Sequence, residues 1–132
     1  MSSEEKQLKE VRGLKLYKKK HTTIKKLLKK TSVPEIHGDK VWFSSYLIMD
    51  YLEKNPPAKK SNIMEIGCGW GILSIHCAKV FKANVVAVDA DKNVFPFLEK
   101  HAELNKAKVK SKVSRFETLK GSLLAEQDMI LG

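Results

Sequence analysis

The sequence has little of what several classes of protein require. Cysteine occurs twice, at Cys68 and Cys77, so a disulfide framework is excluded and a reducing, cytoplasmic setting is expected. No hydrophobic run approaches the roughly 18 residues of a membrane-spanning helix. The N-terminal residues MSSEEKQLKE contain no apolar stretch, which argues against a secretory signal. What remains is a chain of 132 residues, 42% of them hydrophobic, with room for one domain.

Acidic residues are scarce near the N-terminus, where residues 1–30 hold 11 of the 25 basic residues and three of the 15 acids. We therefore expect residues 1–36 to form a basic arm. Its apolar positions have helix-like spacings and predict one or two amphipathic helices packed on the body: Leu8, Val11, Leu14, Ile24, Leu27 and Leu28. A basic arm can attract nucleic acid, an anionic membrane or an acidic protein. Nucleic-acid contact is possible but not favoured, because only Tyr17 is available for base stacking.

The rest of the chain changes pattern at Asn62. Residues 31–40 predict a linker, and residues 41–54 predict a mostly buried helix that begins near Ser44 or Ser45. From Asn62 onward, the sequence predicts an alternation of strands (62–66, 84–89, 109–116, 128–131) and helices (72–81, 94–105, 119–126). This alternation is typical of an α/β, Rossmann-like domain with parallel strands, which we place at residues 37–132. A ligand is then expected at the carboxyl ends of the strands.

A glycine-rich turn, Gly67-Cys-Gly-Trp-Gly71, lies between the first strand and its helix. Glycine allows positive φ and close approach of a ligand, and the helix that follows offers unpaired N–H groups. The dinucleotide pattern G-x-G-x-x-G would need glycine at position 72, which is isoleucine. Asp89 ends the second strand, where a carboxylate can accept hydrogen bonds from both ribose hydroxyls. Asp91 is the alternative acid, but its position suits a helix cap better.

The acid before G-x-G-x-G, together with Asp89, resembles the motifs of class I S-adenosylmethionine-dependent methyltransferases. The segment 38–45 (GDKVWFSS) is similar to the stretch before the core in the methyltransferase-like protein-lysine methyltransferases and the bacterial nicotinamide-methylase-like group. This resemblance implies the sheet order 3-2-1-4 and S-adenosyl-L-methionine as cofactor. The cofactor-binding residues that it implies are Trp42, Glu65, Gly67, Cys68, Gly69, Trp70, Gly71, Asp89, Ala90, Glu117 and Thr118. No catalytic residue is assigned, and no metal-ligand spacing occurs.

The resemblance implies methyl transfer to a protein side chain or a small molecule. The strand predicted at 128–131 would be the fourth of that fold, so we expect a C-terminally truncated sheet with an open edge. A second copy or a partner chain could pair with such an edge. The alternatives are a non-catalytic cofactor-binding or assembly half-domain completed by a partner and, less favoured, a nucleic-acid methyltransferase that uses the lysine arm.

Overall fold

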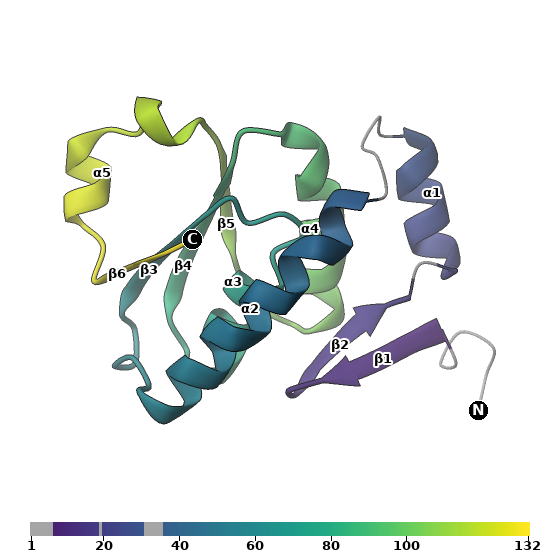
Figure 1. Ribbon diagram of the computed structural model, residues 1–132, viewed down its shortest axis with the longest axis horizontal. Helices are drawn as coiled ribbons and strands as arrows, with labels where there is room; N and C mark the ends of the chain where they lie inside the picture. Colours follow the sequence, from purple (N-terminus) through teal and green to yellow (C-terminus); the bar gives the residue numbers. More distant parts are fainter. Residues whose placement is uncertain (1–6, 19, 31–35) are drawn as a thin grey trace.

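The computed structural model describes residues 7–18, 20–30 and 36–132, the side chains of residues 36–42 excepted. Figure 1 shows the arrangement of its helices and strands. In chain order these are β1 (Leu8–Val11), β2 (Leu14–Tyr17), α1 (Thr22–Lys30), α2 (Ile36–Lys54), β3 (Asn62–Ile66), α3 (Ile72–Val80), β4 (Asn84–Asp89), the 3-10 helix η2 (Lys92–Val94), α4 (Phe95–Leu104), β5 (Lys110–Val113), the 3-10 helix η3 (Phe116–Thr118), α5 (Gly121–Ala125) and β6 (Met129–Leu131).

Four parallel strands form the central sheet in the order β5-β4-β3-β6. This confirms the predicted α/β class and the predicted strand order. The central pair, β3 and β4, covers the predicted ranges 62–66 and 84–89. Both strands are rich in buried apolar residues because a parallel strand is covered on both faces. The carboxyl ends of β3 and β4 therefore lie side by side, which positions the turns that follow them.

Apolar residues pack against both faces of the sheet. On one face, Ile63 and Val85 pack with buried residues of α2, α3 and α4. On the other face, Met64 and Val88 pack against Leu119 and the partly buried leucines of α5. The alternation of neighbouring residues between the two clusters follows from the two-residue period of a strand.

Residues 8–17 differ from the helix predicted for them, because they form an antiparallel hairpin in which Leu8 pairs with Tyr17 and Val11 with Leu14. The turn consists of Arg12 and Gly13, both at positive φ (49° and 81°), and two such residues suit a tight hairpin. Leu14 and Leu16 are buried while Lys15 is exposed, which is the period of a strand. The helix-like spacing of Leu8, Val11 and Leu14 was therefore misleading, since the glycine reverses the chain between them.

The hairpin lies beside α4, at the end of the molecule away from β6 (Figure 1). At its turn, the Arg12 guanidinium donates to both carboxylate oxygens of Asp50 on α2, at 2.8 and 3.2 Å. The same guanidinium lies 4.7 Å from the centre of the Tyr46 ring. These contacts tie the N-terminal hairpin to the body. The helix predicted around Ile24, Leu27 and Leu28 is present as α1.

Helix α2 is longer and less buried than predicted. It begins at Ile36 rather than near Ser44, and so includes part of the predicted linker, since no proline interrupts residues 36–54. Met49 and Leu52 are fully buried, whereas Leu47 and Tyr51 are more than half exposed. Over residues 43–54, the helix therefore buries one stripe rather than most of its surface.

The C-terminal elements are shorter than predicted. Strand β5 ends at Val113 because the chain turns into η3, and α5 is confined to five residues. Strand β6 pairs with β3 at one edge of the sheet. Pairing of another chain at this edge stays a prediction. Within the residues described, no helix is both long and apolar enough to cross a bilayer.

Candidate functional site

The turn predicted to bind a ligand, residues 67–71 (the glycine loop), joins β3 to α3. Its three glycines all have positive φ: 72° at Gly67, 54° at Gly69 and 77° at Gly71. The N–H groups of Gly67 and Cys68 both donate to the carbonyl oxygen of Val88, at 2.8 and 3.0 Å. The loop is therefore fixed to the end of the neighbouring strand, a link that no local sequence pattern indicates.

Asp89 lies at the end of β4, half-buried, and contacts the glycine loop directly. Its Oδ2 accepts a hydrogen bond from the Gly69 N–H at 3.0 Å, and its Oδ1 accepts one from the Asp91 N–H at 2.9 Å. Asp91 itself caps η2 by accepting from the Asn93 N–H at 3.0 Å. The two acids thus have separate tasks: Asp91 is the helix cap that was predicted, and Asp89 presents an oriented carboxylate at the loop. Each carboxylate oxygen retains further lone pairs for a ligand.

Glu65 is buried beneath the glycine loop, near the end of β3. Its Oε1 accepts hydrogen bonds from the Ser74 hydroxyl (2.7 Å) and the Ser74 N–H (3.2 Å). The α3 N-cap, Gly71, has no side chain, so Glu65 satisfies one of the orphan N–H groups of that helix. Burial raises the pKa of Glu65 to about 8, and the nearby Asp89 adds to the rise. Ser74 was not predicted, because only the fold brings it to Glu65.

The raised pKa of Glu65 predicts a specific dependence of stability on pH. Between about pH 4.5 and 8 the folded chain holds a proton on Glu65 that the unfolded chain releases, so the free energy of unfolding falls as the pH rises through this window. Glu65→Gln keeps an oxygen acceptor for Ser74 but does not titrate. We expect it to reduce the loss of stability between pH 5 and 8 by roughly 3 kcal/mol.

Urea denaturation of the wild type and Glu65→Gln at the two pH values measures this difference. Glu99→Gln, which alters an exposed acid on α4, is the matched control. If Glu65→Gln shows the same pH dependence as the wild type and the control, the raised pKa of Glu65 is wrong.

Two side chains of the glycine loop point into the core. Trp70 is 5% exposed and stacks on Phe97, with ring centroids 4.5 Å apart and planes 1° apart. Cys68 packs with Ala87 and Phe95, and burial raises the pKa of its thiol far above the usual range. The side chains of Cys68 and Trp70 therefore anchor the loop in the core, which leaves only their backbone atoms available to a ligand. Cys68 is held as a neutral thiol rather than a nucleophile.

The loop has one packed side and one open side. A Cβ on Gly71 would lie 2.5 Å from the Leu98 side chain, so this glycine is required by the packing of α4 against the loop. A Cβ on Gly67 would meet no atom within 4 Å, and Gly67 is exposed. An open glycine beside an oriented carboxylate fits a ligand that passes over the backbone and presents hydroxyl groups.

Three of the remaining predicted residues, Ala90, Glu117 and Thr118, follow the carboxyl ends of β4 and β5. Ala90 is exposed and follows Asp89, and the Asp89 carbonyl oxygen accepts from the Ser114 N–H just after β5. Glu117 and Thr118 are exposed on η3, where the Thr118 hydroxyl donates to the Arg115 carbonyl oxygen at 3.0 Å. Trp42 lies on α2, and its side chain falls outside the described part of the structure.

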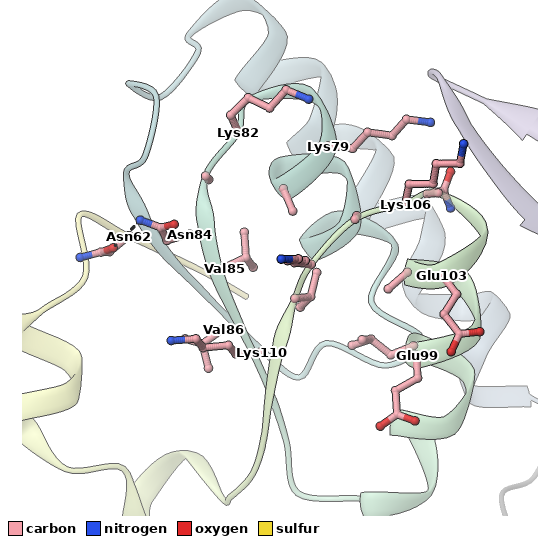
Figure 2. Close-up of a pocket in the computed structure, with 18 of the residues that line it drawn as sticks. Asn62, Lys79, Lys82, Asn84, Val85, Val86, Glu99, Glu103, Lys106 and Lys110 are labelled. Carbon is pink, nitrogen blue, oxygen red and sulfur yellow. Dashed lines mark hydrogen bonds between the residues drawn. The ribbon is translucent and has the colours of Figure 1, made fainter.

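A cavity of about 1300 Å³ lies at the opposite end of the strands (Figure 2). None of the predicted cofactor residues lines it. Figure 2 shows lysines such as Lys82 and Lys106 together with Glu99 and Glu103 around it, a mixture that favours neither an anion nor a cation. Among the described residues, no group of three or more His, Cys, Asp and Glu side chains is placed to hold a metal ion.

Comparison with known proteins finds methyltransferases similar to this chain. The chain is 40% identical over 73 residues to a probable protein arginine N-methyltransferase 3 of Arabidopsis thaliana, and 39% identical over 64 residues to a ubiquinone biosynthesis O-methyltransferase of Pelagibacter ubique. These matches cover 54% and 48% of this chain. They span only 12% and 26% of the two curated relatives, so the chain matches less than a third of either.

A solved structure, an RNA methyltransferase of Salinibacter ruber in complex with S-adenosyl-L-homocysteine, shares the fold. Its TM-score is 0.54 at 15% identity, covering 76% of this chain and 58% of that one. The family model described as lysine methyltransferase matches residues 19–131, which include the whole central sheet and the glycine loop. The chain therefore belongs to the lysine methyltransferase family.

Proposed function

We propose that this chain is the cofactor-binding part of an S-adenosylmethionine-dependent methyltransferase that acts on a protein side chain or a small molecule. The observation that carries the proposal is the contact of Asp89 with the glycine loop, because it joins two predicted halves of a nucleoside site. The two halves come from different strands, 20 residues apart along the chain. Family membership supports the same class of reaction.

S-adenosyl-L-methionine is the cofactor that membership in a methyltransferase family implies. When bound, it supplies a methyl group already activated by its sulfonium leaving group. In our proposal, Asp89 accepts hydrogen bonds from the ribose hydroxyls, and the backbone at Gly67 lets the cofactor pass closely. Glu65 holds the loop through Ser74. Trp42, Ala90, Glu117 and Thr118 stay predicted contacts.

Isothermal titration calorimetry of the 132-residue chain with S-adenosyl-L-homocysteine tests the proposal. We expect saturable binding at one site, since the proposed cofactor contacts lie within the chain. A folded sample, verified by circular dichroism, that shows no binding would refute the claim that this chain holds a working site.

The methyl acceptor is the open part of the proposal. A protein side chain agrees with the family description, and transfer of labelled methyl groups to a cell extract, separated into protein and small-molecule fractions, distinguishes the two acceptor classes. Cofactor binding without transfer to either fraction would favour the alternative of a half-domain that needs a partner.

We place the protein in the cytoplasm as part of the proposal, a location that fractionation of cells tests.

A further inference from the structure

Two side chains at the C-terminal end of α4 form hydrogen bonds with the backbone of β2 and so join the β1–β2 hairpin to that helix. The Lys15 N–H donates to Asn105 Oδ1 at 2.7 Å, and Asn105 Nδ2 donates back to the Lys15 carbonyl oxygen at 2.9 Å. The Tyr17 N–H donates to His101 Nε2 at 3.1 Å. His101 and Asn105 lie four residues apart, on one face of α4. Together they satisfy backbone groups of β2, which holds the hairpin in one place.

His101 has a defined tautomer in this arrangement. Its Nδ1 lies 2.8 Å from the Phe97 carbonyl oxygen, which can only accept, so Nδ1 carries the proton. Nε2 is then the acceptor for the Tyr17 N–H. The ring is 1% exposed, and burial lowers the pKa of His101 to about 4, with a smaller contribution from Lys9 on β1. Both ring nitrogens are therefore in use, and the neutral ring suits its two partners.

The same ring contacts the glycine loop. The Trp70 ring lies 5.8 Å from the His101 ring, with 25° between the planes, and its stacking partner is Phe97. The Tyr17 ring lies 5.2 Å from His101 on the hairpin side. An unbroken series of ring contacts therefore runs from the hairpin, through His101, to the largest side chain of the loop.

Trp70 is well placed to control the loop backbone, because Gly69 and Gly71 flank it, both at positive φ. Glycine has many accessible backbone conformations, so a loop with three glycines needs contacts with other segments to stay in a single conformation. Trp70 adds a side-chain anchor on α4 to the hydrogen bonds that hold the loop to Val88 and Asp89. A change in the His101 ring is thus expected to change the conformations available to the loop.

We propose that His101 is a positioning residue that couples the N-terminal hairpin to the glycine loop, so that a docked hairpin holds the loop in its cofactor-binding form. This inference rests on the proposed function for its effect on the cofactor, although the coupling itself does not. The hairpin, at residues 8–17, lies before the family-matched range 19–131. His101 and Trp70 lie within that range, so the coupling joins a segment outside the matched residues to the glycine loop inside them.

Two variants test the coupling from opposite ends. Gly13→Val places a branched side chain at φ 81° in the hairpin turn, where a Cβ has open space, so the strain arises in the hairpin backbone. The Lys79 side chain on α3 donates to the carbonyl oxygen of Gly13 at 3.1 Å. His101→Phe keeps an aromatic face for Trp70 but removes the acceptor for Tyr17. Gly121→Val is the control for the added side chain, since Gly121 also has open space, lacks a positive φ, and lies at α5, outside this series of contacts.

We expect Gly13→Val and His101→Phe to weaken binding of S-adenosyl-L-homocysteine at least tenfold in calorimetry, in samples whose circular dichroism matches the wild type. Gly121→Val should bind within twofold of the wild type. Unchanged affinity in folded Gly13→Val overturns the proposal. If His101→Phe does not fold, Gly13→Val still tests the proposal, because its substitution lies outside the core and the glycine loop.

Fluorescence separates the coupling from the proposed function. In a Trp42→Phe chain, Trp70 is the single tryptophan, and its emission maximum reports its burial without any cofactor. We expect Gly13→Val in that background to shift the emission to longer wavelength, and Gly121→Val to leave it unchanged. A wild type that does not bind S-adenosyl-L-homocysteine would refute the proposed function alone. An unshifted emission in Gly13→Val would refute the coupling alone.

Discussion

Replacing Gly71 by alanine is expected to lower the free energy of unfolding by about 3 kcal/mol. Two effects combine at this position. The φ of 77° is unfavourable for any residue with a Cβ, and the new Cβ would lie 2.5 Å from Cγ and Cδ1 of Leu98. Leu98 is 1% exposed, so it has little freedom to move away. Urea denaturation at pH 7 measures the loss.

Gly67→Ala is the matched control, because it has nearly the same φ, 72°, but no atom within 4 Å of the new Cβ. Its expected loss of stability is about 1 kcal/mol, from the backbone strain alone. Cofactor binding should show the reverse order. Gly67→Ala should weaken it more than Gly71→Ala, since Gly67 lies on the open side of the loop. Equal losses of stability would contradict the packing described for Gly71 and Leu98.

A double-mutant cycle sharpens the interpretation of Gly71. Leu98→Ala removes the atoms that the new methyl group meets, so the double variant should lose clearly less stability than the sum of the two single variants. Additive losses would show that the strain at Gly71 comes from the backbone rather than from Leu98.

Replacing Asp89 by alanine is expected to weaken binding of S-adenosyl-L-homocysteine by about 1.5–3 kcal/mol, or roughly 10- to 150-fold. The proposed ribose contact is lost, and the Gly69 N–H loses its acceptor, so the loop also becomes less ordered. Calorimetry at pH 7.5 measures the change. An unchanged affinity would refute the ribose role of Asp89.

Asp91→Ala controls for charge and position. Asp91 caps η2 through the Asn93 N–H, and its backbone, not its side chain, contacts Asp89. We expect a small loss of stability and an affinity within twofold of the wild type. A larger loss of affinity in Asp91→Ala than in Asp89→Ala would reverse the assignment of the two acids.

The central part of the fold was predictable because its signals are local. The β-branched run at residues 84–89 and the apolar run at 62–66 coincide with β4 and β3. Glycine at 67, 69 and 71 marked the turn, and the β-branched run that ends at Asp89 marked the end of the second strand. The alternation of strands and helices predicted parallel strands with right-handed crossovers, and the resemblance to class I methyltransferases implied their order in the sheet.

The N-terminal region was harder to predict because its apolar spacing fits two periods. Leu8, Val11 and Leu14 match a helix, whereas Leu14 and Leu16 match a strand. The choice was made by contacts far away in the sequence: Asn105 and His101 bind the backbone of β2, and Arg12 binds Asp50. A local pattern contains no information about such partners.

The sequence by itself determined the order of strands and helices, the glycine loop, and the acids at the ends of β3 and β4, because period, turn residues and charge are properties of short segments. Only the tertiary structure decided what those residues do. In the fold, the side chains of Trp70 and Cys68 lie in the core, the buried Glu65 carboxylate accepts hydrogen bonds from Ser74, and Asp89 accepts one from the Gly69 N–H. These roles depend on burial and on hydrogen bonds between distant segments, which exist only once the sheet brings the segments together.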